Sequence, residues 1–139
     1  MDEQEFKSKT KRVGLEAIRL VEQLPNSRTA DVLSRQLLRA ATAVGANYRA
    51  ACRGKSGADV IAKLSIVEEE ADEVLYWLEV LTEANCVSRS YVAGLMADTD
   101  EVLAMIVASI KTLRNRSLDA KSGIRVVQSK IQNPKSKIC

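Results

Sequence analysis

The sequence predicts an all-α protein built as an antiparallel up-down-up-down four-helix bundle. Apolar residues recur at helical spacing along most of the 139 residues, while the alternation typical of half-buried strands is nearly absent. Turn signals divide the periodic part into four segments joined by short connections. Short connections make consecutive helices antiparallel neighbours, so the four segments are expected to close into one bundle.

The first helix is expected from about Gln4 to Leu24. It stops at Pro25-Asn26-Ser27, a turn signal that also supplies side chains able to cap the next helix. Its apolar face comprises Phe6, Val13, Ala17, Val21 and Leu24, with Leu20 beside it.

The second helix is expected from near Thr29 to Arg53, and it has two opposed faces. Gly54 favours an end there because glycine accepts the left-handed conformation at a helix C-terminus. The packing face comprises Leu33, Leu37, Ala40, Ala41, Val44, Tyr48 and Ala51. The opposite face holds five arginines within roughly 80° of arc. We call them the arginine stripe: Arg28, Arg35, Arg39, Arg49 and Arg53.

The third helix is expected to begin at Ser56, which has capping-box spacing with Asp59. Its apolar residues repeat at alternating spacings of four and three, as knobs-into-holes packing between long helices requires. This seam comprises Val60, Leu64, Val67, Ala71, Val74, Leu78 and Leu81. A fourth helix is expected from about Ser90 to Arg116.

The four helices form one predicted domain, residues 1–116, followed by a flexible basic tail, residues 117–139. The tail contains five Lys or Arg residues and one Asp, and its apolar residues are too sparse for a fifth packed helix. Charge is divided unevenly along the rest of the chain. The net charge is +5 over residues 1–56 and −6 over residues 57–116. This polarity suits an anionic partner, complementary contacts between subunits, or paired neighbouring helices.

The composition argues against an enzyme. The chain has no histidine, which excludes histidine-based triads and Cys-His dyads. Cys52, Cys86 and Cys139 are odd in number and lack metal-ligand spacing, so neither a disulfide framework nor a zinc site is expected. No signal segment or membrane span is apparent. We therefore expect a non-enzymatic cytoplasmic protein with no cofactor, no metal and no membrane contact.

The arginine stripe is the sharpest candidate site, because guanidinium groups in a row suit the phosphates of RNA or DNA. The alternative is a solvated helix face, in which some arginines pair with the acidic third helix. Glu70 borders the seam of that helix and is expected to lie partly buried beside an arginine. No aromatic row accompanies the stripe, so sequence-specific reading of single strands is not expected.

Two further residues are candidates for oligomer contact or helix registry. Asn47 lies at the edge of the packing face of the second helix, among Ala and Gly residues that allow close helix approach inside the bundle or between chains. Trp77 lies apart from both the seam and the main acidic face. It is either a rim residue of the core or an anchor for another subunit.

Two blocks carry a family resemblance: RQLLRAATAVGANY, residues 35–48, and RGKSGADVIAKLSIVEEEADEVLYWLE, residues 53–79. They resemble the bacterial four-helix-bundle family that includes proteins encoded in 23S ribosomal RNA intervening sequences. The resemblance implies a cytosolic bundle that assembles into a homopentameric ring and has no known enzymatic activity. Many members carry Asn-Ile-Ala-Glu-Gly where this chain has residues 47–54. Asn47 carries over and the glutamate does not.

A related branch supplies accessory subunits to diversity-generating retroelement reverse transcriptases, where a basic ring contacts the enzyme and nucleic acid. The resemblance and the arginine stripe together favour a homo-oligomeric bundle that binds RNA or DNA phosphates. The alternative function is an oligomeric protein-interaction scaffold or accessory subunit without direct nucleic-acid binding.

Overall fold

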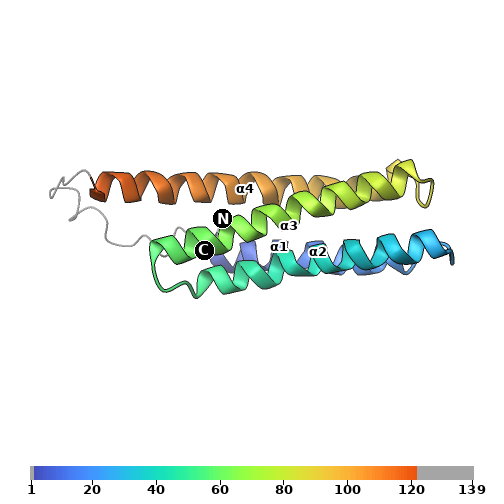
Figure 1. Cartoon of the computed structure of the whole chain (residues 1–139), viewed down its shortest axis with the longest axis horizontal. Coiled ribbons are helices and arrows are strands. Elements are labelled where there is room, and N and C mark those ends of the chain that lie inside the picture. The colour runs from blue at the N-terminus through green and yellow to red at the C-terminus, as the bar shows by residue number, and fades with distance from the viewer. Residues whose placement is uncertain (1, 122–139) are drawn as a thin grey trace.

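A computed structural model of the chain describes residues 2–121, which form four helices and no strand. The helices are α1 (Glu3–Val21), α2 (Arg28–Cys52), α3 (Gly57–Glu83) and α4 (Arg89–Lys121), as Figure 1 shows. Consecutive helices run in opposite directions along one long axis. The predicted all-α four-helix bundle is confirmed.

The fourth helix is longer than expected. It continues through residues 117–121, which were expected to belong to the tail. No Pro or Gly interrupts the chain between Arg116 and Lys121, so backbone hydrogen bonding propagates through these residues. The remainder of the expected tail, residues 122–139, lies outside the described residues.

Side-chain caps fix where three helices begin. The side chain of Asp2 accepts a hydrogen bond from the backbone N–H of Glu5, at 2.8 Å. The Ser27 hydroxyl accepts from Ala30 N–H at 3.0 Å, and the Ser56 hydroxyl accepts from Asp59 N–H at 3.1 Å. Each cap satisfies a donor that the first turn of a helix leaves unpaired.

The end of α2 differs in detail from the expectation for Gly54. The backbone of Gly54 does not adopt the left-handed conformation. Glycine suits this position for a steric reason, because a Cβ there would collide with the side chain of Val60 and lie 3.1 Å from the carbonyl oxygen of Ala51. Among residues 2–121 the left-handed backbone conformation is found at Asn85, with φ 62°, just after the end of α3.

The core follows the predicted seam of α3. All seven seam residues are buried, six of them at 0% exposure and Val60 at 8%. The other helices contribute matching apolar faces, including Val13 and Ala17 of α1, Leu37 and Val44 of α2, and Val102 and Ile106 of α4. Two buried hydroxyls, Thr10 and Thr99, donate to carbonyls one turn earlier in their own helices.

Helices α1 and α2 approach each other closely because small residues line their contact. A Cβ at Gly45 would lie 3.1 Å from Lys11 Cα and 3.2 Å from the carbonyl oxygen of Thr10. Near one end of this contact the rings of Phe6 and Tyr48 stack with centroids 4.5 Å apart. Gly45 therefore allows close approach between two helices of the same chain.

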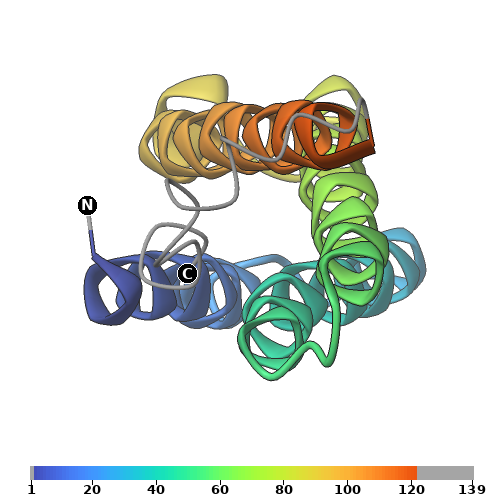
Figure 2. The same cartoon turned by 90° about the vertical axis from the view of Figure 1, so that its left-hand side faces the viewer.

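Viewed along its axis, the bundle has α1 and α2 side by side along one side, α3 along the next and α4 opposite α1 and α2 (Figure 2). Helix α2 packs on α1 and α3, and α4 packs mainly on α3. The smaller contact between α1 and α4 includes two ion pairs, Lys9 with Glu101 at 2.5 Å and Arg12 with Asp98 at 3.8 Å.

Candidate nucleic-acid interface

All five members of the arginine stripe are exposed; four lie within α2, and Arg53 is the residue that caps its C-terminal end. The helix contains 25 residues. At 1.5 Å per residue its length is about 37 Å, close to one turn of a nucleic-acid duplex, about 34 Å. The stripe therefore has a length suited to a run of backbone phosphates.

The middle of the stripe is neutralised by the protein itself. Arg35 forms an ion pair with Asp31, one turn earlier on α2. Arg39 reaches across to α3, where it contacts a carboxylate oxygen of Glu70 at 3.2 Å and pairs with Glu73. As expected, Glu70 is partly buried beside an arginine, with 17% of its side chain exposed.

Glu73 is the centre of this network, because the indole N–H of Trp77 also donates to its Oε1 at 3.0 Å. The hydrogen bond from Arg39, followed by that from Trp77, holds the pKa of Glu73 below its usual value. Hydrogen bonds to Glu73 and then to Glu70 raise the pKa of Arg39. Both shifts favour the charged forms, so Arg39 and Glu73 stay ionised at neutral pH and satisfy each other.

The remaining members, Arg28, Arg49 and Arg53, form no ion pair within residues 2–121. Arg28 lies at the start of α2, whereas Arg49 and Arg53 lie at its end. The stripe is thus divided into a paired centre and unpaired ends.

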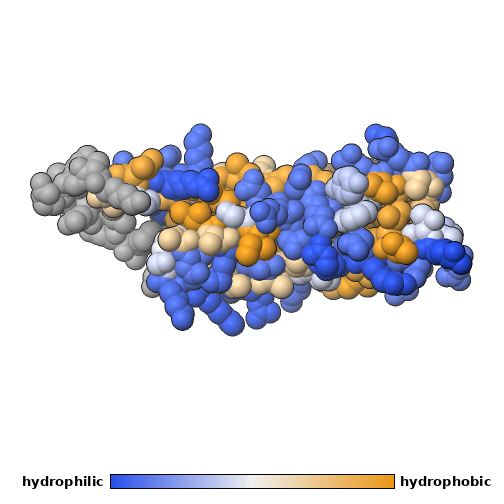
Figure 3. Space-filling model, in the orientation of Figure 1, coloured by the Kyte–Doolittle hydropathy of each residue, from blue (hydrophilic) through white to orange (hydrophobic). Residues whose placement is uncertain are grey.

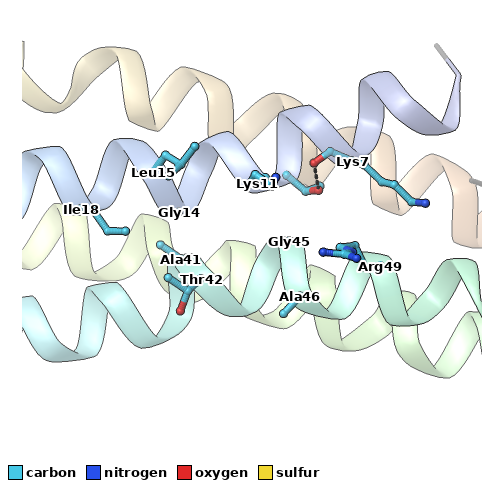
Figure 4. A pocket seen from close by; sticks show the side chains of 11 residues that line it. Lys7, Lys11, Gly14, Leu15, Ile18, Ala41, Thr42, Gly45, Ala46 and Arg49 are labelled. Carbon is cyan, nitrogen blue, oxygen red and sulfur yellow. Dashed lines mark hydrogen bonds between the residues drawn. The ribbon is translucent and has the colours of Figure 1, made fainter.

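Arg49 belongs to a second cationic feature that the sequence did not reveal. It lines a groove between α1 and α2 together with Lys7 and Lys11 of α1, as Figure 4 shows. We call this the basic groove. Lys7 pairs with Glu3 at 2.8 Å, while Lys11 has no carboxylate partner among the described residues. In the sequence, the spacing of four residues between Lys7 and Lys11 indicates that the two lysines share one face of their helix. It does not indicate that Arg49 of another helix lies opposite them.

The charges are also separated along the bundle axis. Antiparallel packing brings the start of α1, the end of α2 and the end of α4 to one end of the molecule (Figure 1). Basic residues predominate there: Lys7, Lys9, Lys11, Arg49, Arg53, Lys111, Arg114 and Arg116. We call this the basic end. Acidic residues predominate in the opposite half, where the second half of α3 meets the start of α4.

The two candidate registry residues make hydrogen bonds within their own helices. The Asn47 side chain is half-buried, and its amide donates to the Ala43 carbonyl at 2.8 Å. Trp77 is half-buried against the core and bonds Glu73. Trp77 thus lies at the rim of the core, one of its two expected positions. Oligomer contact by either residue stays a prediction.

No group of three or more His, Cys, Asp or Glu residues is arranged to hold a metal ion within the described part of the chain. None of the four described helices has an apolar stretch long enough to cross a lipid bilayer. Cys52 and Cys86 are free thiols, each half-buried.

The fold and the site define a small all-α bundle with a cationic stripe along its second helix. The model of the 23S rRNA-intervening sequence protein family matches residues 2–108, and the chain belongs to that family. It is also similar to a solved structure described as a protein of unknown function from the S23 ribosomal protein family of Bacteroides thetaiotaomicron. The two are 34% identical, with 76% of this chain and 98% of that chain covered and a TM-score of 0.71. A comparison with curated proteins finds no match.

Proposed function

We propose that this protein is a non-enzymatic, self-associating cytoplasmic bundle that binds RNA or DNA through backbone phosphates. The observation that supports this function best is the set of cations at the basic end. Lys11, Arg49 and Arg53 are exposed and have no carboxylate partner within residues 2–121. Unpaired guanidinium groups bind phosphate bidentately, and each neutralised phosphate releases condensed counterions.

The division of the arginine stripe sharpens this proposal. Arg39 would have to leave Glu70 and Glu73 before it could bind a phosphate, and Arg35 would have to leave Asp31. Arg49 and Arg53 have no such competitor among the carboxylates of residues 2–121. Binding is therefore expected to depend on the end of α2 more than on its centre, with weak sequence preference because phosphates carry no base identity.

Two double variants of α2 test the proposal. Arg49→Gln/Arg53→Gln removes two unpaired charges, and Arg35→Gln/Arg39→Gln removes the same number of paired charges. The first is expected to weaken binding to structured RNA or duplex DNA by about 10-fold or more at low salt. It should also reduce the salt dependence of log K by about one unit for each lost phosphate contact. The second is expected to change binding by less than about threefold, since its charges are already neutralised.

Filter binding or fluorescence anisotropy at about 50 and 200 mM salt measures both quantities. Equal losses in the two variants would mean that net charge, rather than the unpaired arginines, governs binding. Absence of binding by the unaltered chain at about 50 mM salt would reject nucleic acid as the ligand.

A protein-interaction scaffold without direct nucleic-acid binding is the second candidate function. The observation that favours it is the pairing of Arg35 and Arg39 with carboxylates, which removes the centre of the stripe from phosphate binding. The same binding assay separates the two functions, because a scaffold predicts no salt-dependent association with RNA or DNA. The resemblance to a family of homopentameric rings supports self-association in either case.

A further inference from the structure

We propose that the basic groove holds a terminal phosphate of an RNA or DNA strand, together with the nucleoside that carries it. The inference rests on the proposed function and names its ligand as a single-stranded end that carries a terminal nucleoside monophosphate. The phosphate would lie among Lys7, Lys11 and Arg49, and the nucleoside would lie on the apolar floor between α1 and α2. Lys11 and Arg49 therefore stay available to the nucleic acid that the proposed function requires.

The cations of the groove match the charge of a terminal phosphate. Lys7 and Lys11 of α1 and Arg49 of α2 lie at the same end of the groove (Figure 4), and no carboxylate is among the described residues that line it. Glu3 pairs with Lys7 at 2.8 Å, so three cations and one carboxylate leave a net charge of +2. A terminal phosphate carries about −1.5 to −2 at neutral pH, whereas an internal phosphodiester carries about −1. A terminal phosphate therefore neutralises this cluster more completely.

The rest of the groove offers an apolar floor to the attached nucleoside. Small residues line its middle: Gly14, Ala41, Gly45 and Ala46. The Thr42 hydroxyl is bonded to the Leu38 carbonyl at 2.7 Å, and the Thr42 methyl lies 3.5 Å from the position that a Cβ of Gly14 would take. Leu15 and Ile18 border the floor and are 44% and 42% exposed. Such a surface packs against a base without reading its hydrogen-bonding edge, and the base must come from an unpaired end because duplex bases are stacked.

Neighbouring groups favour the end of a strand over a free nucleotide. The three cations of the groove also line a polar hollow, together with the exposed side chains of Gln4 and Ser8. Arg53 is exposed one helical turn beyond Arg49, about 6 Å further along the axis, and forms no ion pair within residues 2–121. These groups can bind the next phosphates of a strand, which a free mononucleotide lacks.

A second hollow, between α3 and α4, shows that exposed apolar surface alone does not suit this ligand. It is lined by Ser65, Glu68, Glu69, Asp72, Leu103 and Val107. Figure 3 shows hydrophobic surface between α3 and α4, interrupted by hydrophilic side chains. The three carboxylates of this hollow would repel a phosphate. Of the two hollows, the basic groove is the one that combines apolar surface with cations that lack a carboxylate partner among the described residues.

Three versions of one short single-stranded RNA test the ligand. They carry a phosphate at the 5′ end, a phosphate at the 3′ end, or hydroxyl groups at both ends, with a fluorescent label inside the strand. Fluorescence anisotropy at about 100 mM salt should show at least one phosphorylated version bound about 10-fold more tightly than the unphosphorylated one, because the phosphate adds charge-assisted hydrogen bonds. Adenosine monophosphate should compete only weakly, since it lacks the neighbouring phosphates.

Removal of the α1 cations tests the phosphate end of the groove. Lys7→Gln/Lys11→Gln should abolish the preference for a phosphorylated end, while the arginines of α2 still bind other phosphates of the strand. The matched control Arg19→Gln/Arg28→Gln also removes one paired and one unpaired cation, but it does so outside the groove. This control should retain the preference.

Removal of exposed apolar side chains tests the floor of the groove. Leu15→Ser/Ile18→Ser should weaken binding of the preferred phosphorylated RNA severalfold. It should leave the salt dependence of log K unchanged, because no phosphate contact is lost. Circular dichroism confirms that each variant is folded. If one of the two groove variants fails to fold, the other still tests the groove.

Four outcomes would overturn the proposal. They are equal affinity of the unaltered chain for the three RNAs, a lysine variant that keeps the preference, a control that loses it, and competition by adenosine monophosphate as strong as that by the phosphorylated strand. Salt-dependent binding without preference for a phosphorylated end would reject this site and retain the proposed function. Absence of binding to any RNA or DNA at low salt would instead reject the proposed function itself.

Discussion

Gly45 offers the sharpest test of how α1 and α2 pack, through its substitution by alanine. In the interior of an exposed helix, Gly→Ala stabilises a protein by about 0.5–1 kcal/mol, because alanine loses less backbone entropy on folding. At Gly45 the added Cβ would meet Lys11 Cα at 3.1 Å, and Lys11 N and the Thr10 carbonyl oxygen at 3.2 Å. All three are backbone atoms, so relief requires the helices to separate by a few tenths of an ångström.

Overpacking of this type costs about 1–3 kcal/mol. The gain in helix propensity offsets part of that cost, so Gly45→Ala should lower the free energy of unfolding by up to about 2 kcal/mol. The matched control is Gly94→Ala in α4, where a Cβ would meet no atom within 4 Å. This control should raise the free energy of unfolding by about 0.5–1 kcal/mol.

Urea denaturation followed by circular dichroism measures both variants, at equal protein concentration because self-association stabilises the folded state. The two free energies of unfolding should differ by about 1–3 kcal/mol, with melting temperatures separated by several degrees in the same direction. Equal stabilisation by both substitutions would refute the argument that close backbone approach requires glycine at position 45.

Two further predictions concern a helix cap and a pH-dependent ion pair. Ser56→Ala removes the hydroxyl that accepts the hydrogen bond from Asp59 N–H, so it should lower the free energy of unfolding by about 1 kcal/mol. The control Ser8→Ala, at an exposed position inside a helix, should cause no such loss. Equal losses in the two variants would argue against the cap. Glu73→Gln removes a carboxylate whose pKa is lowered in the fold, chiefly by Arg39. The folded state therefore favours the ionised form of Glu73, so at neutral pH the unaltered chain should be more stable than the Glu73→Gln variant. The difference in the free energy of unfolding should be less than about 1 kcal/mol, because the Glu73 side chain is 35% exposed. This difference in stability should disappear as the pH falls below 4.5, the ordinary pKa of a glutamate side chain, because Glu73 then becomes protonated. Urea titrations at several pH values measure it, and a difference that does not depend on pH would contradict the prediction.

The helices could be predicted from the sequence because burial on a long helix follows a local period. Spacings of four and three place successive residues on one stripe whatever the partner is, and the predicted seam from Val60 to Leu81 is buried throughout. The caps at Ser27 and Ser56 are also local features. The end of α4 was harder to predict, because no Pro or Gly follows Arg116 before residue 121 to stop the helix.

The state of each arginine could not be predicted, because it depends on residues far away in the sequence. The partners of Arg39 lie 31 and 34 residues further along the chain, and a projection of α2 alone cannot indicate which flank faces α3. Glu70 was the exception, since its place beside the seam already required a compensating charge. The grouping of Arg49 with Lys7 and Lys11 needed the packing of α2 on α1.

The separation of charge along the bundle axis has a consequence for how the molecule meets a polyanion. A rod that is positive at one end and negative at the other carries a large dipole moment, which turns it in an external field before contact. The basic end should therefore lead the approach to RNA or DNA, with the acidic half of α3 directed away. Steering of this kind accelerates association by about 10-fold or more and is lost at high salt, so salt should slow binding as well as weaken it.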